Sequence, residues 1–599
     1  MSELSVSLAS FFELMERRAS AEFLVDEQGV MSYASLCENV RRCCSLFDLH
    51  QLSEGARVLI VTRDERVAIA VFIAALLDGK VPVMLAPDIP EAHAAAINLS
   101  ITPSLTVVDG TRREEEWTRG AIITRAKRKA PFISAFSNSS VIRIPMPNES
   151  RKPRLPPSVD ALAYILFTSG TTQSPNGVMI SRRNLFSQLQ TLSRLFHFEQ
   201  KSRIFNSMVL AHADGLVQGP LLAIFAGCTL IRIGAFSISQ MEDWLNAVRA
   251  NRATHFFSVP TVYNLIDRYA GHNDYFDAAE FLCLISVAAK LESALWERLQ
   301  VRFKRPLYNQ YGLTETVVSA LYAGPHPEMG PLGTLGKPVD VEARLLGLDG
   351  AAVLDGNSGE LLLAGKNIFI GYWNNPVRTA EVMTADGWFR TGDLALKRPD
   401  GAYEILGRLK TVIMCGGMLI RPDEIDEVLK SHPGVASAVT VGIPNSDFDE
   451  VPISAVILDN FVSESDLTNY CRERLEPLKV PKRILAFDAI PRGNSGKPLL
   501  ANLRTIILSR LEIGPSDPAD QNHLDLARDT IRLAATIFRV SPEMLSRHSS
   551  PETVPGWDSF SQINLILAAE SRFSVLIPAA KIASIRTLHD LIQAIETCQ

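Results

Sequence analysis

Short apolar runs alternate with longer apolar segments along the first 405 residues of the chain. The runs at 58–61, 81–85 and 105–108 have the length and β-branched content of buried strands. Between and after them, the segments 67–77 and 185–195 are long enough for helices. Strands that alternate with helices are typical of α/β layers. The pattern therefore predicts an α/β fold for this part of the chain.

The pattern changes near residue 407 and again near residue 514. We expect residues 1–406 to form a large α/β domain and residues 407–510 a small α+β domain of short strands and amphipathic helices. Residues 511–522 contain the Pro, Asp and Ser content of a linker. Residues 523–599 are predicted to be a separate all-α bundle of four helices. One of its helices is indicated by an apolar stripe: Leu524, Ala527, Ile531, Ala534, Ala535 and Phe538. Thr587 and Asp590 predict a capped final helix.

Composition indicates a large globular protein. The chain has 599 residues, of which 47% are hydrophobic and 21% charged, and its formal net charge is −6. This balance gives no indication of nucleic acid or an anionic membrane as a partner. Residues 110–160 are rich in charge, proline and serine and are expected to form surface excursions. The basic stretches 125–129 and 151–154 are expected to be solvated loops.

Cysteine usage and the apolar segments favour a cytoplasmic protein. The eight cysteines form no CxxC pair, which fits a reducing compartment, and Cys43 and Cys44 are expected to pack inside a helix. Residues 1–17 lack the basic start and cleavage region of a signal peptide. The apolar stretch 208–233 is interrupted by polar residues, so we expect a buried core segment and not a membrane span.

The most informative segment is a strand-like run at 163–167 that leads into a loop of small residues. The loop residues are Thr168, Ser169, Gly170, Thr171 and Thr172. Backbone N–H groups and hydroxyls in such a loop can surround a polyphosphate without steric conflict. No Gly-Lys-Ser/Thr follows, so the loop is not a Walker loop. The alternative for this segment alone is a solvent-exposed turn.

A second motif at 308–316 has groups suited to a nucleotide. Tyr311 lies beside Gly312, where an aromatic ring can stack on a purine while the backbone stays close. Thr314 offers a hydroxyl to a phosphate, and Glu315 offers a hard oxygen ligand to Mg²⁺. The alternative is a strand-to-loop transition with an incidental acid.

Three more motifs follow in the second half of the chain. Segment 387–393 places the carboxylate of Asp393 after a glycine turn, where it can grip two ribose hydroxyls. An Asp in an ordinary hairpin turn is the alternative. A Gly-Arg-Leu-Lys sequence at 407–410 lies at the predicted domain boundary, and a glycine-flanked loop at 493–497 ends in a lysine.

The ordered set of motifs resembles the adenylate-forming superfamily, which contains acyl-CoA synthetases, luciferases and the adenylation domains of peptide synthetases. The resemblance covers about residues 15–505 and implies binding of ATP, AMP and Mg²⁺. It implies that the β- and γ-phosphates are held by the loop residues Thr168, Ser169, Gly170, Thr171 and Thr172. It further assigns adenine to Asn309 and Tyr311 beside Gly312, the α-phosphate to Thr314 and Mg²⁺ to Glu315. In the later motifs it implies that Asp393 and Arg408 bind the ribose, that Lys410 lies at the hinge between the two domains, and that Lys497 is the lysine needed for adenylation.

The implied chemistry follows from charge. A carboxylate attacks the α-phosphorus of ATP, so two anions must approach each other. Mg²⁺ and a lysine offset this repulsion and the charge that develops on the pyrophosphate. Loss of one such contact commonly lowers the rate on the order of 10²–10³. The family then rotates its small domain at the hinge, which withdraws the lysine and admits a thiol.

The sequence departs from the family pattern in two places. In the phosphate loop, Gln173 replaces a glycine and Asn176 replaces a lysine, so one positive charge is missing. Arg182 or Arg183 of the next helix is a candidate replacement. In the substrate segment 286–291, the candidate pocket residues Val287 and Ala288 add volume where many long-chain enzymes have glycine. This added volume favours a short or thin acyl group.

A further segment bears on the acid. His212, a candidate catalytic residue, begins a His-x-x-Gly-Leu sequence that resembles acyl- and aryl-activating members. Amino-acid-activating members place an aspartate where this chain has Ala213. We expect a fatty or aryl acid, while Asp214, one residue away, keeps an amino acid as the alternative. Ala213, Asp214 and Gly215 are predicted to line the substrate pocket.

The C-terminal segment resembles an acyl or peptidyl carrier domain. Ser559 follows Gly-Trp-Asp at the predicted start of an amphipathic helix, with Phe560 where the family usually has leucine. The alternative is an Asp N-cap with a first-turn serine. The resemblance implies that Ser559 receives 4′-phosphopantetheine from CoA through a phosphopantetheinyl transferase. A tethered thiol has an effective concentration commonly near millimolar, so it is expected to compete well with free CoA.

Together these features predict a self-loading enzyme. It would form an acyl-AMP from a small-molecule carboxylic acid and pass the acyl group to its own phosphopantetheine thiol. The product would feed a downstream polyketide synthase or peptide synthetase. The alternatives are an amino-acid-activating module, an acyl-CoA ligase, and a catalytically lapsed nucleotide-binding homologue whose Gln173 and Asn176 reflect lost chemistry.

Overall fold

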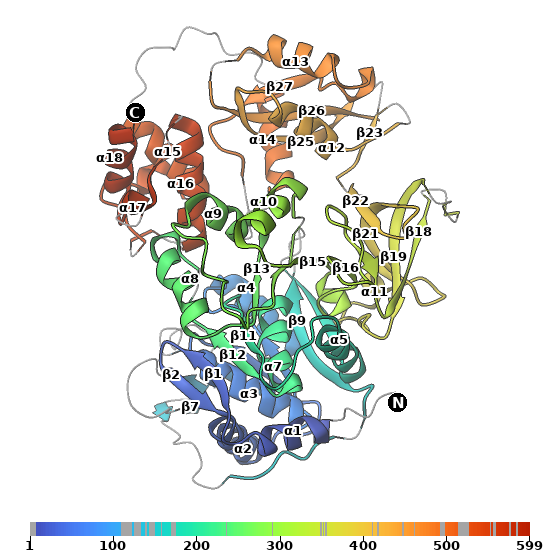
Figure 1. Cartoon of the computed structure of the whole chain (residues 1–599), viewed down its shortest axis with the longest axis vertical. Coiled ribbons are helices and arrows are strands. Elements are labelled where there is room, and N and C mark those ends of the chain that lie inside the picture. Colours follow the sequence, from blue (N-terminus) through green and yellow to red (C-terminus); the bar gives the residue numbers. More distant parts are fainter. Residues whose placement is uncertain are drawn as a thin grey trace. The chain divides into compact units, whose positions relative to one another are not determined.

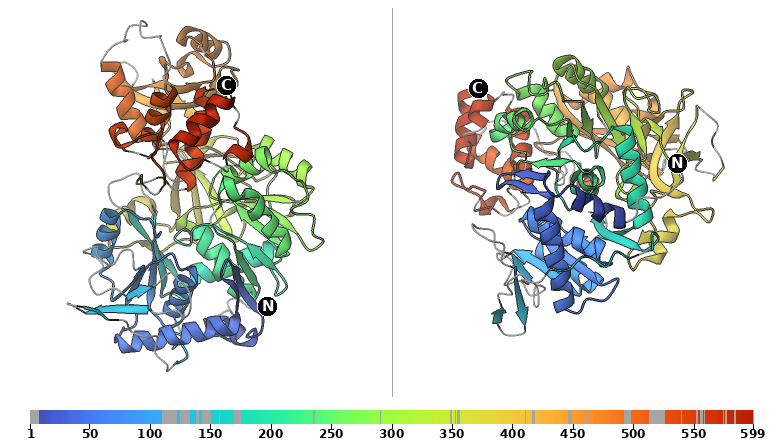
Figure 2. Two further views of the ribbon diagram at one scale, coloured as in Figure 1. Left: turned by 90° about the vertical axis from the view of Figure 1, so that its left-hand side faces the viewer. Right: turned by 60° about the horizontal axis from the view of Figure 1, so that its bottom comes forward.

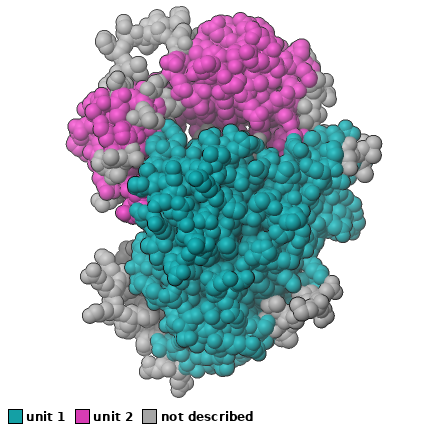
Figure 3. Space-filling model, viewed as in Figure 1, with its two compact units in different colours: residues 1–235, 244–391, 396–404 teal, residues 236–243, 392–395, 405–599 magenta. Residues whose placement is uncertain are grey.

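The computed structural model divides the chain into two compact units (Figures 1 and 3). The first contains residues 1–235, 244–391 and 396–404, and the second contains residues 236–243, 392–395 and 405–599. The structure describes residues 8–109, 122–124, 133–137, 140–142, 150–156, 158–168, 175–234, 236–289, 291–347, 350–351, 353, 356–409, 411–415, 418–445, 449–460, 462–491, 498–512, 526–538, 540–551, 553–554, 557, 559–573, 575, 577–582 and 585–598.

The first unit contains two large sheets, and Figure 2 shows them from two further sides. In hydrogen-bonding order, the strands of one sheet are β17 (Lys337–Pro338), β16 (Leu321–Ala323), β15 (Leu307–Tyr311), β14 (Cys283–Ser286), β13 (His255–Ser258), β11 (Arg203–Phe205), β12 (Thr229–Arg232), β1 (Glu22–Asp26) and β2 (Gly29–Ser32). The strands from β15 to β1 in this order pair in parallel. Parallel strands place their carboxyl ends at one edge, where α/β sheets commonly bind ligands.

The other large sheet continues the same α/β pattern. In order, its strands are β20 (Gly371–Tyr372), β10 (Asn176–Ser181), β9 (Leu162–Thr168), β4 (Val81–Met84), β3 (Arg57–Val61), β5 (Leu105–Asp109), β6 (Ile122–Thr124), β7 (Ile133–Ser137) and β8 (Ser140–Ile142). The central strands, from β9 to β6, pair in parallel. The strands predicted at 58–61, 81–85, 105–108 and 163–167 are therefore confirmed, because each lies in this sheet.

Helices surround these sheets. Those of the region up to residue 390 are α1 (Leu8–Arg17), α2 (Tyr33–Leu49), α3 (Glu65–Leu77), α4 (Glu91–Ile101), α5 (Arg182–Leu195), α6 (Ala213–Leu216), α7 (Leu222–Ala226), α8 (Met241–Ala250), α9 (Pro260–Tyr269), α10 (Ser293–Phe303) and α11 (Pro376–Val382). Every residue of α3 from Ala68 to Leu77 is buried, as expected for a helix that is apolar all round. The helices predicted at 67–77 and 185–195 are confirmed, and Cys43 and Cys44 are buried in α2.

A smaller four-stranded sheet follows in the chain. Its order is β18 (Val341–Leu346), β19 (Ser358–Gly365), β21 (Phe389–Lys397) and β22 (Tyr403–Arg408). The second unit contains a five-stranded sheet with β24 (Met418–Ile420), β23 (Ile413–Cys415), β26 (Asp449–Leu458) and β25 (Val435–Asn445), and with β27 (Arg483–Ala486) beside β26. Its helices are α12 (Pro422–Lys430), α13 (Glu464–Arg472) and α14 (Leu500–Glu512). Alternate residues of β25 face two apolar clusters, one with α12 and α13 and one with α14. This small α+β part of the prediction is confirmed.

Helices also form beyond residue 525. They are α15 (Leu526–Phe538), α16 (Ser559–Phe573), α17 (Ala579–Ile582) and α18 (Leu588–Cys598). The rings of Phe538 and Trp557 stack with their centroids 4.5 Å apart. The predicted cap of the last helix is present, because Asp590 N–H donates to Thr587 Oγ1 at 3.2 Å and Thr587 N–H donates to Asp590 Oδ2 at 2.8 Å.

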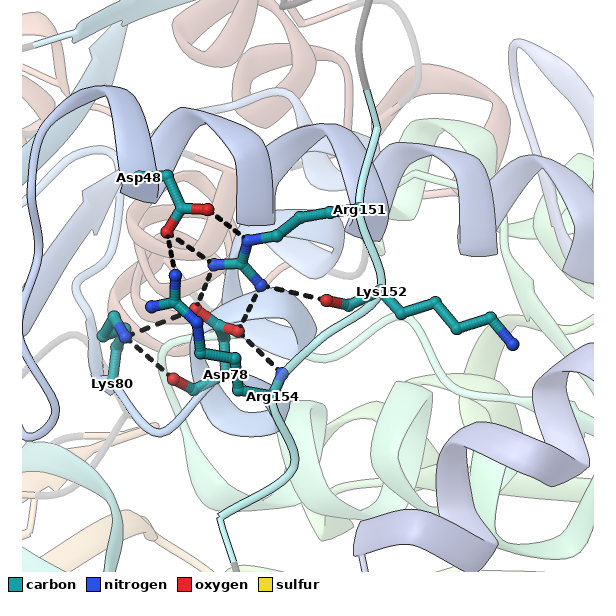
Figure 4. A network of polar contacts seen from close by, with 6 residues as sticks. All are labelled: Asp48, Asp78, Lys80, Arg151, Lys152 and Arg154. Carbon is teal, nitrogen blue, oxygen red and sulfur yellow. Dashed lines mark hydrogen bonds and ion pairs between the residues drawn. The ribbon is translucent and has the colours of Figure 1, made fainter.

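The basic stretch 151–154 corrects one expectation in part. Residues 150–156 form a loop in which Lys152 and Arg154 are exposed, as expected, but an ion-pair network also ties this loop to Asp48 and Asp78 (Figure 4). Arg151 donates to both oxygens of Asp78, at 2.6 and 2.8 Å, and also pairs with Asp48. Lys80, itself 2% exposed, donates to the Asp78 carbonyl at 2.9 Å. A buried carboxylate needs such partners, which local composition does not reveal. Residues 125–129 lie outside the described residues.

Among the described residues, the helices are too short or too polar to cross a bilayer. The stretch 208–233, predicted to be a buried core segment, contributes α6, α7 and β12 to the first unit, and most of it is buried.

Candidate nucleotide and acid site

The predicted phosphate loop begins where β9 ends. Thr168 is the last residue of β9 and pairs with Asn176, the first residue of the antiparallel strand β10. The apolar run before Thr168 forms β9 because it is buried between neighbouring strands. Of the predicted phosphate ligands, Ser169, Gly170, Thr171 and Thr172 lie outside the described residues, as does Gln173.

Glu315 lies in a short 3₁₀ turn, Thr314–Thr316, that follows β15. Its Oε1 atom accepts a hydrogen bond of 2.7 Å from the Tyr372 hydroxyl, and its carbonyl accepts one of 2.8 Å from Phe369 N–H. Tyr372 belongs to β20, where it pairs with Val178 of β10. The turn that carries Thr314 and Glu315 also contacts β10 directly. Two motifs that are almost 150 residues apart in sequence are therefore joined through β10 and β20.

The end of β15 carries buried polar atoms that lack partners. Asn309 is 3% exposed and lies beside Ser286 of β14, which is fully buried. Within the described residues, Asn309 Oδ1 and Ser286 Oγ have no hydrogen-bond partner. Buried polar atoms are rarely left unsatisfied, so these two indicate a place where a ligand or water belongs.

Gly312 is required for steric reasons. A Cβ atom at this position would lie 2.0 Å from the carbonyl oxygen of Val318. Tyr311, the last residue of β15, is half-buried beside it. The chain therefore folds back on itself immediately after the predicted adenine-binding strand.

A buried amide network holds this fold-back. Asn367 Nδ2 donates to Ser319 O at 2.9 Å and to Gln188 Oε1 at 3.1 Å. Gln188 Nε2 in turn donates to the Tyr322 hydroxyl at 2.8 Å, and Ser319 donates to Gln310 Oε1 at 2.5 Å. Asn367 and Gln188 were not among the predicted site residues, because an isolated Asn or Gln carries no motif signal. Their burial becomes visible only once α5 and the strand ends are brought together.

Two non-glycine residues at the strand ends have positive φ. Val317 has φ 65° and ψ −57°, and Val318 N–H donates across it to Thr316 O at 2.8 Å. Ala288 has φ 68°, and Ala289 N–H donates across it to Val287 O at 2.9 Å. Both are γ-turns of the strained hand. Such strain concentrates at functional sites, and here it follows two adjacent strands of one sheet.

The His-x-x-Gly-Leu segment forms the start of α6. His212 precedes the helix, and part of its surface is exposed. The surrounding protein partly desolvates the imidazole and so lowers its pKa, an effect that the negative charge of Asp88 opposes. Ala213 is buried, and the half-buried Asp214 accepts a hydrogen bond of 3.0 Å from Gln218 Nε2. Gly215 is packed so closely that a Cβ atom there would lie 2.2 Å from the Val209 carbonyl oxygen.

The other predicted substrate residues differ in exposure. Val287 is buried, whereas the neighbouring Ala288 is exposed. The side chains of Val287 and Ala288 therefore lie in different environments, one in the protein interior and one at the surface.

The suggestion that Arg182 or Arg183 replaces the missing loop lysine is wrong. Arg182 donates to Ser158 O at 2.8 Å, and Arg183 forms a bidentate pair with Asp160 at 2.6 and 3.0 Å. Both partners precede β9, whereas the loop follows it. The two ends of this strand are on the order of 20 Å apart. Because β10 runs antiparallel to β9, the helix after it begins at the end remote from the phosphate loop.

The remaining predicted residues belong to the second unit. Arg408 Nε lies 2.6 Å from Asp393 Oδ1, and Asp393 is 1% exposed, so the predicted ribose pair is in contact. Lys410 and Lys497 lie outside the described residues. Ser559 is the first residue of α16.

Comparison with protein families decides the identity of this fold. The model of the AMP-binding enzymes matches residues 11–373, and the model of the AMP-binding enzyme C-terminal domain matches residues 424–497. This chain belongs to the AMP-binding enzyme family. Its large α/β region and its small α+β region are the two parts that these family models describe.

Curated relatives include CoA ligases. The chain is 33% identical to the sulfoacetate–CoA ligase of Cupriavidus necator over 397 residues, which are 65% of this chain and 76% of that enzyme. It is 33% identical to the oxalate–CoA ligase of Arabidopsis thaliana over 340 residues, which are 56% of this chain and 65% of that enzyme. The second alignment thus covers slightly less than two thirds of the relative.

Solved structures share the fold. MatB from Rhodopseudomonas palustris with bound ATP has a TM-score of 0.72 at 23% identity, covering 83% of this chain and 98% of that chain. The o-succinylbenzoate CoA synthetase of Bacillus subtilis with its acyl-adenylate has a TM-score of 0.71 at 23% identity, covering 82% of this chain and 97% of that chain.

Proposed function

We propose that this AMP-binding enzyme is an acid–thiol ligase. It joins a carboxylic acid to ATP with release of pyrophosphate, then transfers the acyl group from the acyl-AMP to a thiol with release of AMP. The observation that carries this proposal is the connection of the Thr168 loop to Glu315 through β10, β20 and Tyr372 in a member of this family.

We assign the nucleotide roles according to the family motifs. The proposed phosphate ligands are Thr168, Ser169, Gly170, Thr171 and Thr172, with Thr314 at the α-phosphate. The proposed adenine and ribose contacts are Asn309, Tyr311, Gly312, Asp393 and Arg408. The orphaned Oδ1 of Asn309 supports the adenine assignment, because a base amino group would satisfy it. In the same scheme, Lys497 is the adenylation lysine and Lys410 the hinge.

Glu315 suits a magnesium ion. Within the described residues, its only side-chain hydrogen bond is the one that Oε1 accepts from Tyr372, so Oε2 is available as a hard oxygen ligand. A bound Mg²⁺ would supply positive charge against the phosphates during attack by the acid. The Tyr372 hydroxyl would hold the carboxylate in orientation.

The acid is proposed to lack an ammonium group. Amino-acid-activating members place an aspartate where this chain has the apolar Ala213, and Asp214, one residue further on, is held by a hydrogen bond from Gln218. The two CoA ligases named above are named for sulfoacetate and oxalate, which are acids without an amino group. His212, Ala213, Gly215, Val287 and Ala288 are the residues proposed to shape acid binding. This supports a non-amino carboxylic acid, of the aryl or fatty class or a shorter one.

Free CoA is favoured as the thiol. The two curated relatives named above are CoA ligases, so we place free CoA before the carrier thiol, the reverse of the order expected from sequence. The second candidate acceptor is 4′-phosphopantetheine on Ser559. It is favoured by one observation, the position of Ser559 at the first turn of α16, where the helix dipole and free N–H groups suit a phosphodiester. In that case a phosphopantetheinyl transferase and a downstream synthase or synthetase are the partners, and 511–522 and 523–599 are linker and carrier domain.

One experiment tests both acceptors. The 599-residue chain, produced with a phosphopantetheinyl transferase, is incubated with ATP, Mg²⁺, CoA and a panel of acids that includes sulfoacetate, oxalate, malonate, ferulate and amino acids. Mass spectrometry then detects acyl-CoA in solution and an acyl adduct on the protein. Acyl-CoA formation with wild type and Ser559→Ala alike supports the ligase, whereas an adduct that Ser559→Ala abolishes supports the carrier. Absence of AMP formation with every acid contradicts the proposal and favours a lapsed homologue.

A further inference from the structure

A buried arginine lies beneath the segment that carries His212. Arg232, the last residue of β12, is 3% exposed. Its guanidinium binds the Glu65 carboxylate through Nε at 2.7 Å and through Nη2 at 2.6 Å. It also donates through Nη1 to Asn206 O and through Nη2 to Met208 O, both at 2.8 Å. Four of its five N–H donors are thus used, and the planar fork fixes their directions.

The two carbonyl groups that Arg232 holds begin the turn that leads to α6. Asn206 follows β11 directly and is fully buried. Its Nδ2 atom donates to Asp214 O at 2.9 Å and to Gln218 O at 3.1 Å, while its Oδ1 accepts from Met208 N–H at 3.0 Å. One asparagine therefore fastens both ends of segment 206–218, and Arg232 fastens that asparagine.

The carbonyl of Met208 also determines where Gly215 lies. A Cβ atom at Gly215 would be 2.6 Å from Met208 O and 2.2 Å from Val209 O. Val209 O in turn accepts a hydrogen bond of 3.0 Å from His212 N–H. Glu65, Arg232, Met208 and Gly215 thus form a continuous series of contacts, and the first two lie outside any motif of the sequence.

We propose that Arg232 is a positioning residue that sets affinity for the acid, with Glu65 orienting its guanidinium. This inference rests on the proposed function, in which segment 212–216 binds the acid. Loss of the fork releases the Asn206 and Met208 carbonyls, so the backbone of His212 and Gly215 is no longer held. Among the described residues, Thr168 and Glu315 form no hydrogen bond or ion pair with Arg232 or Glu65. Binding of the acid is therefore expected to weaken while binding of ATP is retained.

The test is acid-dependent ATP–pyrophosphate exchange on the full chain. The probe is whichever of sulfoacetate, oxalate, malonate or ferulate gives the fastest wild-type exchange. For Arg232→Met we expect the KM for that acid to rise about tenfold, with the KM for ATP within about twofold of wild type. Arg232→Lys keeps the charge but not the fork, so it is expected to restore only part of the acid affinity. Hydrogen exchange should quicken in peptides covering 206–218.

Arg203 provides a matched control in the same sheet. It begins β11, pairs with Glu22 at 2.6 Å and donates to Asn251 O at 2.6 Å, but it lies at the opposite end of the strands. Arg203→Met is expected to lower stability without separating the two KM values. If Arg232→Met does not fold, Glu65→Gln tests the proposal instead. The Glu65 side chain is 41% exposed, so this variant should fold, and it should also raise the KM for the acid.

Two outcomes overturn different claims. A wild-type protein that shows exchange, with Arg232 or Glu65 variants in which both KM values are unchanged or rise equally, contradicts the positioning role alone. A wild-type protein that shows no exchange with any acid contradicts the proposed function, and the positioning role falls with it.

Discussion

At the scale of single residues, Ala288 and Val317 show where the strand ends of the first unit are strained. Each follows a strand of the parallel sheet, and each has the positive φ that glycine adopts without steric conflict. Val317 is fully buried, so its side chain also packs, whereas Ala288 is exposed. The conformation of Ala288 is therefore imposed by the turn and not by packing of its methyl group.

Ala288→Gly is expected to stabilise the protein. Glycine relieves the positive φ at a cost in the entropy of the unfolded chain, leaving a net gain of about 0.5–1 kcal/mol. Chemical denaturation followed by tryptophan fluorescence measures the change. Ala289→Gly is the control, since Ala289 is also exposed but has no positive φ. That variant should lose about 0.5 kcal/mol. Equal losses in both variants would contradict the assignment of strain.

Asp426 is a second residue with an unusual state. It lies in α12, is 8% exposed, and its Oδ1 has no hydrogen-bond partner within the described residues. Burial raises its pKa to about 7, an effect that Asp423 strengthens and that Thr440 and Lys430 oppose. The folded protein therefore favours the protonated form of this carboxyl group.

The stability contribution of Asp426 should fall as pH rises. Because its folded pKa is above the ordinary value of 3.8, the contribution is complete below that value and is lost between about pH 4 and pH 7. Asp426→Asn removes the titration. We expect the variant to be more stable than wild type at pH 8 and the difference to shrink toward pH 4. Thermal unfolding across this pH range is the measurement, and a constant difference would contradict the shift.

At the scale of elements, local apolar patterning was sufficient to predict most strands and helices of the large sheets. The pattern reports burial of each segment, which is a local property of β3, β4, β5 and β9. It does not report strand direction. The prediction that Arg182 or Arg183 replaces the loop lysine was wrong for this reason. Because β10 runs antiparallel to β9, it places both arginines at the end of β9 remote from the phosphate loop. Likewise, no local signal joins Arg151 to Asp78, which lies more than 70 residues earlier.

Asp78→Asn should destabilise the first unit. Burial opposes ionisation of Asp78, but hydrogen bonds from Arg151 and from Arg154 N–H outweigh it and lower its pKa. Removing the charge deprives the buried Lys80, whose Nζ lies 3.3 Å from Asp78 Oδ2, and Arg151 of their carboxylate, so we expect a loss of about 3 kcal/mol at pH 7. Denaturant unfolding at this pH tests the value. Asp160→Asn, at the exposed pair with Arg183, is the control and should change little.

At the scale of the whole molecule, the predicted site was recognisable because each motif is short and contiguous. The contacts that orient those motifs come from distant parts of the chain, which explains why the sequence analysis missed them. Tyr372 reaches Glu315 from β20, Asn367 reaches Ser319, and Arg232 reaches Met208. Each is a single polar residue whose role depends on the tertiary fold.

Lys497→Ala should separate the two half-reactions. In the role proposed for it, Lys497 is needed only while charge develops between the acid and ATP, so acid-dependent pyrophosphate exchange is expected to fall on the order of 10²–10³. Transfer of the acyl group from a synthetic acyl-AMP to CoA should change little. The exposed Lys430 of the same unit provides the control Lys430→Ala. Equal loss of both steps would contradict a role confined to adenylation, and an unchanged exchange rate would favour a lapsed homologue.

The attachment of residues 150–156 bears on how this chain tolerates changes of length. Arg151, Arg154 and Leu155 anchor the backbone of residues 150–156 to the end of α3, since Arg151 and Arg154 N–H bind the Asp78 carboxylate and Leu155 N–H donates to Leu77 O at 3.0 Å. Doubling a loop adds only about 0.6 kcal/mol to the entropy of closing it. Extra residues introduced upstream of Ser150 would therefore be absorbed before this anchor. Strand β9 would keep its register.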